Sequence, residues 1–205
     1  MRSLLAGLAA LVLPCVAVVP VQAQEQAAGA TVTVANMAFG PAKVRVGMGE
    51  TVTWTFQDTI SHTATSDEGF FDTGAASGGA SRSVRFASAG AFAYHCNFHS
   101  MMVGKVTVPM AATGSVKDGW KLRWRVGDNP KGRTYDVQQR RAGTKTWSLF
   151  RNQTASGSGR FDPGSGSWQV RARTIKKDRA SGWSPTLDLS DAATAPRTVA
   201  VRPQV

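Results

Sequence analysis

Residues 94–106 read Tyr94-His-Cys-Asn-Phe-His-Ser-Met-Met-Val-Gly-Lys-Val106 and place a thiol, an imidazole and two thioethers between Cys96 and Met102. Soft sulfur ligands combined with imidazole favour copper over hard cations such as calcium and magnesium. Zinc takes thiolate and imidazole readily, but thioether is not among its usual ligands. Two histidines, one cysteine and a weak axial methionine form the type 1, or blue, copper arrangement. The stretch therefore indicates a mononuclear copper site.

The spacing within this stretch predicts how the ligands meet. Side chains alternate across a strand, so Tyr94 and Cys96 share one face, and Cys96 falls where that strand ends. A tight loop after Cys96 can bring His99 and Met102 to the same point, and Gly104 then opens the next strand. One loop would thus supply three of the four ligands.

The second histidine ligand has to come from another segment. The sequence contains three histidines, and strand alternation turns His95 away from Cys96 towards solvent. His62 is the candidate that remains, and it lies in a loop-rich excursion over residues 57–81. Two alternatives stay open: His62 is an ordinary loop histidine, or Cys96 is a buried structural thiol without a metal.

The rest of the chain shows the pattern of short strands. β-Branched and aromatic residues alternate with polar ones in segments such as 51–56, and a second series of this kind begins after residue 119. No helical period of useful length appears, so we expect an all-β protein with two domains. The expected boundaries are a first domain at 31–110, a linker at 111–118, a second domain at 119–190 and a polar tail at 191–205.

The N-terminus predicts export. Arg2 precedes an apolar run, and compact residues end it at Ala23, which is typical of a signal peptide spanning residues 1–23. The mature protein would then be secreted, periplasmic or at the cell surface, without a transmembrane segment; an uncleaved membrane anchor is the alternative. Cleavage would remove Cys15 and leave Cys96 as the only thiol. A lone thiol in an oxidising compartment is prone to oxidation, and binding to a metal would protect it.

The motif resembles the cupredoxin family, specifically its plastocyanin–amicyanin branch. The matching positions are an aromatic residue followed by Cys96, His99, Met102 and Gly104, with the Asp58–His62 segment resembling the first-ligand region. The short gap between His99 and Met102 looks like that of amicyanin. That gap favours Met102 over Met101 as the axial ligand. Thr63 stands where the family often has asparagine, which puts the hydrogen bond that locks the loop in question.

The resemblance implies a Greek-key β-sandwich and a carrier of single electrons that cycles between Cu(I) and Cu(II). It also implies that a redox partner protein docks near His99, on a surface formed with Phe98, Met101 and Val103. No enzyme is expected, because three histidines cannot supply a second copper set and no nucleophile signature is present. The alternative functions are copper buffering outside the cytoplasm, and surface adhesion with a vestigial first domain.

The second domain resembles a fibronectin type III module, which implies a second, immunoglobulin-like sandwich. The resemblance is carried by Trp124, the Tyr135–Gln138 segment, Trp147, the Val170–Arg173 strand and Ser181-Gly-Trp-Ser-Pro185. Arg171 and Arg173 share a strand face, and Trp183 is expected to stack between them.

Charge is distributed unevenly between the two halves. Residues 31–110 carry 5 basic and 5 acidic side chains, whereas residues 111–205 carry 18 and 7. The basic half is explained either by a solvated surface or by binding to an anionic cell-surface polymer, without specific recognition of nucleic acid.

Overall fold

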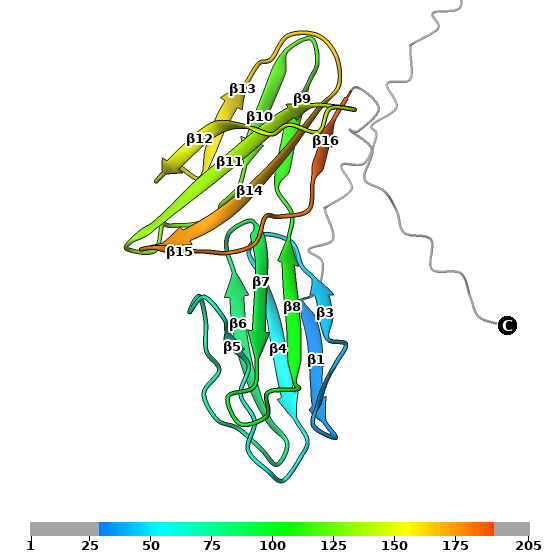
Figure 1. The fold of residues 1–205 in the computed structure, drawn as a ribbon, viewed down its shortest axis with the longest axis vertical. Helices are drawn as coiled ribbons and strands as arrows, with labels where there is room; N and C mark the ends of the chain where they lie inside the picture. Colours follow the sequence, from blue (N-terminus) through cyan, green and yellow to red (C-terminus); the bar gives the residue numbers. More distant parts are fainter. Residues whose placement is uncertain (1–28, 191–205) are drawn as a thin grey trace, which may run out of the picture.

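The computed structural model describes residues 29–190, and these form sixteen β-strands without a helix. The predicted signal peptide and the predicted polar tail lie outside the described residues. Within the described part, no helix is long and apolar enough to cross a membrane. The strands form four sheets in two successive pairs, so the all-β prediction is confirmed (Figure 1).

The first β-sandwich carries the copper motif. One sheet has the order β2 (Ala38–Gly40), β1 (Ala30–Ala35), β4 (Glu50–Phe56), β6 (Ala80–Phe86). The other has the order β3 (Lys43–Arg45), β8 (Val103–Val108), β7 (Gly90–His95), β5 (Thr65–Ser66). Two neighbouring pairs, β1–β4 and β3–β8, are parallel, so the chain crosses between the sheets rather than running through hairpins alone. This architecture is a cupredoxin-like β-sandwich.

Alternating side chains fill the space between these two sheets. In β4, Val52, Trp54 and Phe56 are buried while the threonines between them are partly exposed. Phe86 and Phe92 are buried with them, and their rings lie 5.4 Å apart at an angle of 52° to each other. Cys96 and Met102 belong to this same core cluster. The copper motif is therefore built on the rigid interior of the first sandwich.

The second pair of sheets begins earlier than the sequence predicts. Residues expected to be a linker include strand β9 (Ala111–Ser115), which pairs with β10 (Gly119–Arg123). The small residues of β9 carry little strand signal of their own, and pairing with β10 determines their conformation. β13 (Ser158–Phe161) completes the sheet β13-β10-β9.

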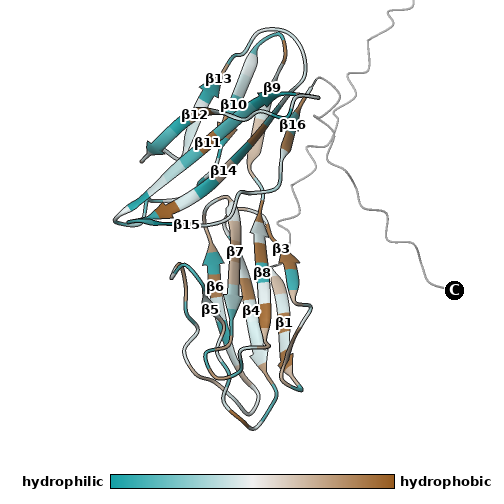
Figure 2. Cartoon of the chain, in the orientation of Figure 1, coloured by the Kyte–Doolittle hydropathy of each residue, from teal (hydrophilic) through white to brown (hydrophobic). Residues whose placement is uncertain are grey.

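The opposite sheet has the order β12 (Ser148–Thr154), β11 (Arg133–Arg141), β14 (Trp168–Lys176), β15 (Arg179–Ala180), and β16 (Leu187–Leu189) also pairs with β14. A separate core cluster, which includes Trp120, Trp124 and Tyr135, lies between the two sheets. Figure 2 shows hydrophilic residues along β12 and β13.

The two sandwiches meet end to end through backbone pairing (Figure 1). The turn between β6 and β7 is joined to the second sandwich by an antiparallel bridge from Ser88 to Arg125, and the start of β7 by one from Ala91 to Gly182. Thr174, fully buried on β14, donates its hydroxyl to that turn, with Ser88 Oγ at 2.9 Å and Ala89 O at 3.0 Å. The loop between β7 and β8 lies at the other end of the first sandwich. The junction therefore leaves the copper motif uncovered.

Candidate metal centre

The loop after β7 is closed by three backbone hydrogen bonds. The N–H of Cys96 donates to the carbonyl of Met102 at 3.1 Å, and the N–H of Met102 donates to the carbonyl of His99 at 3.0 Å. The N–H of His99 donates back to the carbonyl of Cys96 at 3.3 Å. These bonds fold the loop so tightly that the side chains of Cys96, His99 and Met102 leave it in one neighbourhood.

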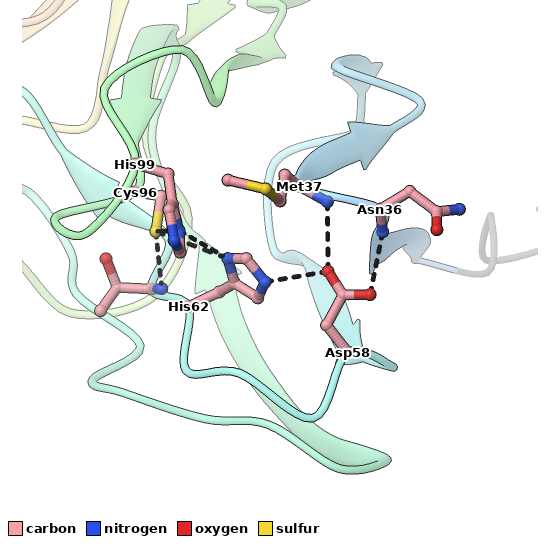
Figure 3. Close-up of polar contacts among 7 residues, drawn as sticks. Asn36, Met37, Asp58, His62, Cys96 and His99 are labelled. Atoms are coloured by element: carbon pink, nitrogen blue, oxygen red, sulfur yellow. Dashed lines mark hydrogen bonds and ion pairs between the residues drawn. The ribbon is translucent and has the colours of Figure 1, made fainter.

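Three predicted ligands meet at one point, as Figure 3 shows. Cys96 Sγ lies 3.8 Å from His62 Nδ1 and 3.6 Å from His99 Nδ1. The two Nδ1 atoms lie 3.1 Å apart. Cys96 and His62 are buried, whereas His99 is partly exposed. His62 therefore lies beside the other two side chains as a third donor that could hold a metal ion.

The ring of His62 is oriented by the Asp58 carboxylate, for which the sequence predicted no role of its own. His62 Nε2 lies 2.9 Å from Asp58 Oδ2 (Figure 3). Asp58 also accepts the backbone N–H groups of Asn36 at 2.9 Å and Met37 at 3.1 Å. These backbone hydrogen bonds, followed by the bond from His62, hold the pKa of Asp58 below its usual value. Asp58 is therefore a carboxylate at neutral pH, and it accepts a hydrogen bond from the Nε2–H group of His62.

This arrangement fixes which nitrogen of His62 is free. With the proton on Nε2, the lone pair on Nδ1 points at Cys96 and at Nδ1 of His99. The two imidazole nitrogens and the sulfur face one another at these distances. All three atoms can donate an electron pair to one shared cation. The donor set of one thiolate and two imidazoles is the trigonal set of blue-copper sites. The residues present therefore fit a copper ion.

Thr63 makes the hydrogen bond between the two ligand loops, although the family often has asparagine at this position. Its hydroxyl accepts the backbone N–H of Asn97 at 2.9 Å, and its own backbone N–H points to Cys96 Sγ at 3.4 Å. Thr65 donates its hydroxyl to Thr63 Oγ1 at 3.0 Å. A threonine thus supplies the acceptor that ties the His62 segment to the Cys96 loop.

The two candidate axial methionines differ sharply in position. Met102 is 2% exposed and packs in the core cluster that contains Cys96. Met101 is 74% exposed and points to solvent. His95 also lies on the outside, as predicted, where Nδ1 pairs with Asp67 Oδ1 at 2.7 Å. Of these side chains, only Met102 lies on the inner side of the loop.

Glycine at position 104 has a packing reason. A Cβ built on Gly104 would overlap the ring of Tyr94, whose side chain lies across the start of β8. Tyr94 is buried and contacts Phe39 and Trp54 edge to face. The aromatic residue before the cysteine and the glycine after the loop are therefore one packing unit.

The comparisons with known proteins agree with this construction for the first sandwich. Residues 26–109 match the family model of copper-binding proteins, plastocyanin/azurin family. Among solved structures, a reduced amicyanin mutant is 32% identical over 39% of this chain and 81% of that chain, with a TM-score of 0.34. A purple cupredoxin from Nitrosopumilus maritimus is 27% identical over 38% and 98%, with a TM-score of 0.36. No curated protein matches the chain.

The fold, the family match and the donor set together define a class. The first sandwich is a cupredoxin-like β-sandwich, and its His62, Cys96 and His99 side chains form a donor set that can hold a copper ion. The family match ends at residue 109 and leaves the second sandwich uncovered.

Proposed function

We propose that this protein is an extracytoplasmic carrier of single electrons, with copper bound by His62, Cys96, His99 and Met102. A bound copper ion would supply the Cu(I)/Cu(II) couple. The protein side chains hold the ligands, exclude water and provide a surface through which a partner exchanges the electron. On this reading the protein is a redox carrier rather than an enzyme.

The observation that carries the proposal is the different exposure of the two histidines. His62 is fully buried, whereas His99 reaches the surface in a loop with exposed apolar side chains. The structure has six exposed large hydrophobic residues among those described, and five of them frame this end of the first sandwich. Those five are Met37, Ile60, Phe98, Met101 and Val103. Such a patch marks an interaction site.

Contacts within the protein also hold the ligand side chains in place. Asp58 orients His62, and the Thr63–Asn97 bond holds the two ligand loops together. The sandwich core fixes Cys96 and Met102. A scaffold that holds the ligand geometry suits electron transfer, because both oxidation states then need little rearrangement.

In this proposal the second sandwich is a fibronectin type III-like module. Its three-stranded and five-stranded sheets enclose a single core, as in immunoglobulin-like sandwiches. It is attached at the end away from the ligand loop (Figure 1), so a redox partner would reach His99 without meeting it. The apolar N-terminal run and the resemblance to cupredoxins support a location outside the cytoplasm.

Copper reconstitution of the full chain tests the ligand set. We expect an intense blue Cu(II) form that Cys96→Ala abolishes. Met102→Leu should shift the absorption spectrum and the reduction potential, while Met101→Leu leaves both unchanged because Met101 points to solvent. A colourless copper-loaded protein would contradict the proposal.

Electron self-exchange between the Cu(I) and Cu(II) forms tests the carrier role and needs no known partner. Phe98→Ser should slow self-exchange at the His99 surface by about tenfold or more, since docking brings the two sites together. Leu149→Ser is the matched control, because Leu149 is the exposed apolar residue on the second sandwich. Blue copper that binds tightly but does not cycle reversibly would indicate copper buffering instead.

A further inference from the structure

The second sandwich carries an alternating stack of arginine and tryptophan side chains on one sheet face. Arg140 and Arg171 both lie over the ring of Trp147, with their Cζ atoms 4.3 and 4.1 Å from its ring centroid. Arg171 and Arg173 lie in the same way on Trp183, each at 4.7 Å. The sequence predicted that Trp183 stacks with Arg171 and Arg173, and the structure confirms this contact. The structure adds Trp147 and Arg140 to the same stack. We call these five side chains the arginine ladder.

Each arginine of the ladder is also fixed by a partner directly across the β11–β14 pair. Arg173 donates to Asp136 Oδ2 at 3.0 and 2.8 Å. Arg171 donates to Gln138 Oε1 at 3.0 and 2.7 Å. Arg140 donates through Nε to Gln169 Oε1 at 2.7 Å. The guanidinium groups are therefore held rigidly, and little side-chain entropy remains to be lost when a ligand binds.

The ladder carries more positive charge than its partners balance. Only Arg173 faces a carboxylate, whereas Arg171 and Arg140 face neutral amides. The nearby Asp188 contacts Gln169 rather than an arginine of the ladder. Burial, and then the like charges of Arg140 and Arg173, lower the pKa of Arg171. Crowded cations without counter-charges are a place where a bound anion is stabilised.

The stacking decides what kind of anion fits. Trp147 and Trp183 each already carry two guanidinium groups over the ring, so the ladder offers a ligand cations rather than bare aromatic rings on which a nucleobase or a sugar ring would stack. A guanidinium group stacked in this way still offers N–H donors in its plane, and Arg140 uses only Nε within the described residues. In-plane donors match the oxygens of carboxylate and sulfate groups.

We infer that the arginine ladder is a docking surface for an anionic polysaccharide, which is bound through carboxylate or sulfate groups repeated along its chain. The ladder lies on the outer face of the β11–β14 pair, where the charged side chains line up in a row. Such a surface would hold the protein at the cell exterior while the copper end remains free. The inference does not depend on the copper site.

Equilibrium binding of the full chain to heparin and to polygalacturonate tests the surface. We expect Arg140→Gln/Arg171→Gln to weaken binding by about tenfold or more, since two charge-assisted contacts are lost. The matched control is Lys121→Gln/Arg123→Gln, which removes the same charge from exposed positions of β10 in the opposite sheet. The control should weaken binding by less than about threefold at physiological salt.

A second variant separates geometry from charge and guards against misfolding. Arg140→Lys/Arg171→Lys keeps the net charge but removes the planar fork, so it should also bind more weakly than the control. The fluorescence of the buried Trp120 and Trp124 reports whether the second sandwich of each variant is folded. Cys96→Ala should bind the polysaccharides as well as the unmodified chain does.

Three results would overturn the inference. Equal losses in the ladder and control variants would show that only diffuse charge matters. Failure of the unmodified chain to bind either polysaccharide at low salt would remove the ligand class. Tighter binding to duplex DNA than to both polysaccharides, lost in the same ladder variants, would assign the surface to nucleic acid instead.

Discussion

Thr63 Oγ1 accepts the backbone N–H of Asn97 across 2.9 Å, and this bond connects two ligand loops that are 34 residues apart in sequence. The adjacent backbone N–H of Thr63 lies 3.4 Å from Cys96 Sγ. One residue therefore contacts both the thiol and the loop that carries His99 and Met102. Because the hydroxyl also accepts a bond from Thr65, its orientation is set from both sides.

Replacing Thr63 with valine should loosen this connection without changing the volume of the side chain. The N–H of Asn97 would lose its acceptor, which costs about 1–3 kcal/mol where the group stays shielded from water. We expect a lower free energy of unfolding in denaturant and a broader Cu(II) absorption band. Thr63→Ser keeps the hydroxyl and should restore most of both. Equal behaviour of the valine and serine variants would show that the hydroxyl does not lock the loop.

Replacing Gly104 with alanine should damage the hairpin that carries the ligands. The new methyl group would overlap the Tyr94 ring, which is buried against Phe39 and Trp54 and cannot move freely. Overpacking of this kind costs about 1–3 kcal/mol. Thermal unfolding of Gly104→Ala beside Gly104→Ala/Tyr94→Leu measures the effect. The second change should recover part of the loss, and no recovery would mean that the ring is not the obstacle.

The sequence was sufficient for the ligand loop because the loop is local. Cys96, His99 and Met102 are separated by a few residues: strand alternation turns Cys96 inward, and the tight loop after it brings His99 and Met102 to the same side. The aromatic core positions followed from the same alternation. His62 could be inferred by elimination, although its contact with the other ligands spans two loops and depends on the closed sandwich.

The features that the sequence did not reveal arise from long-range placement. Asp58 looks like an ordinary loop carboxylate until the β1–β2 turn brings the N–H groups of Asn36 and Met37 to it. The strand at 111–115 has small residues and weak strand propensity, and its partner β10 determines it. Trp147 joins the arginine ladder only through the pairing of β11 with β12 and β14.

The loop at the junction of the two sandwiches should respond to pH through Glu68. Burial raises the pKa of this carboxyl above the ordinary 4.5, and the charge of Asp67 adds to the shift. Its Oε2 atom is buried without a hydrogen-bond partner among the described residues. The folded state therefore holds the proton more tightly than the unfolded state does. Its contribution to stability is present at low pH and is lost as pH rises from about 4.5 through the raised pKa.

Comparing unfolding free energies of the unmodified chain and Glu68→Gln across that range isolates this contribution. The glutamine variant should be the more stable of the two at pH 7, and the difference should shrink as the pH falls. Asp178→Asn, which changes an exposed acid, is the control. A constant difference between Glu68→Gln and the unmodified chain at all pH values would contradict the assignment.

Replacing Asp58 with asparagine should weaken copper binding without disturbing the sandwich. Asp58 accepts three hydrogen bonds, and asparagine would offer one oxygen and turn its NH₂ group against a donor. His62 would lose the partner that keeps the proton on Nε2, so its Nδ1 lone pair would no longer be fixed towards Cys96. Loss of such a partner typically costs 10–100-fold in metal affinity, and we expect about that reduction in a chelator competition titration. Glu50→Gln is the matched control, since Glu50 accepts the N–H of Gly47 at the opposite end of β4. An unchanged copper affinity in Asp58→Asn, with the control also unchanged, would show that the carboxylate does not orient the ligand.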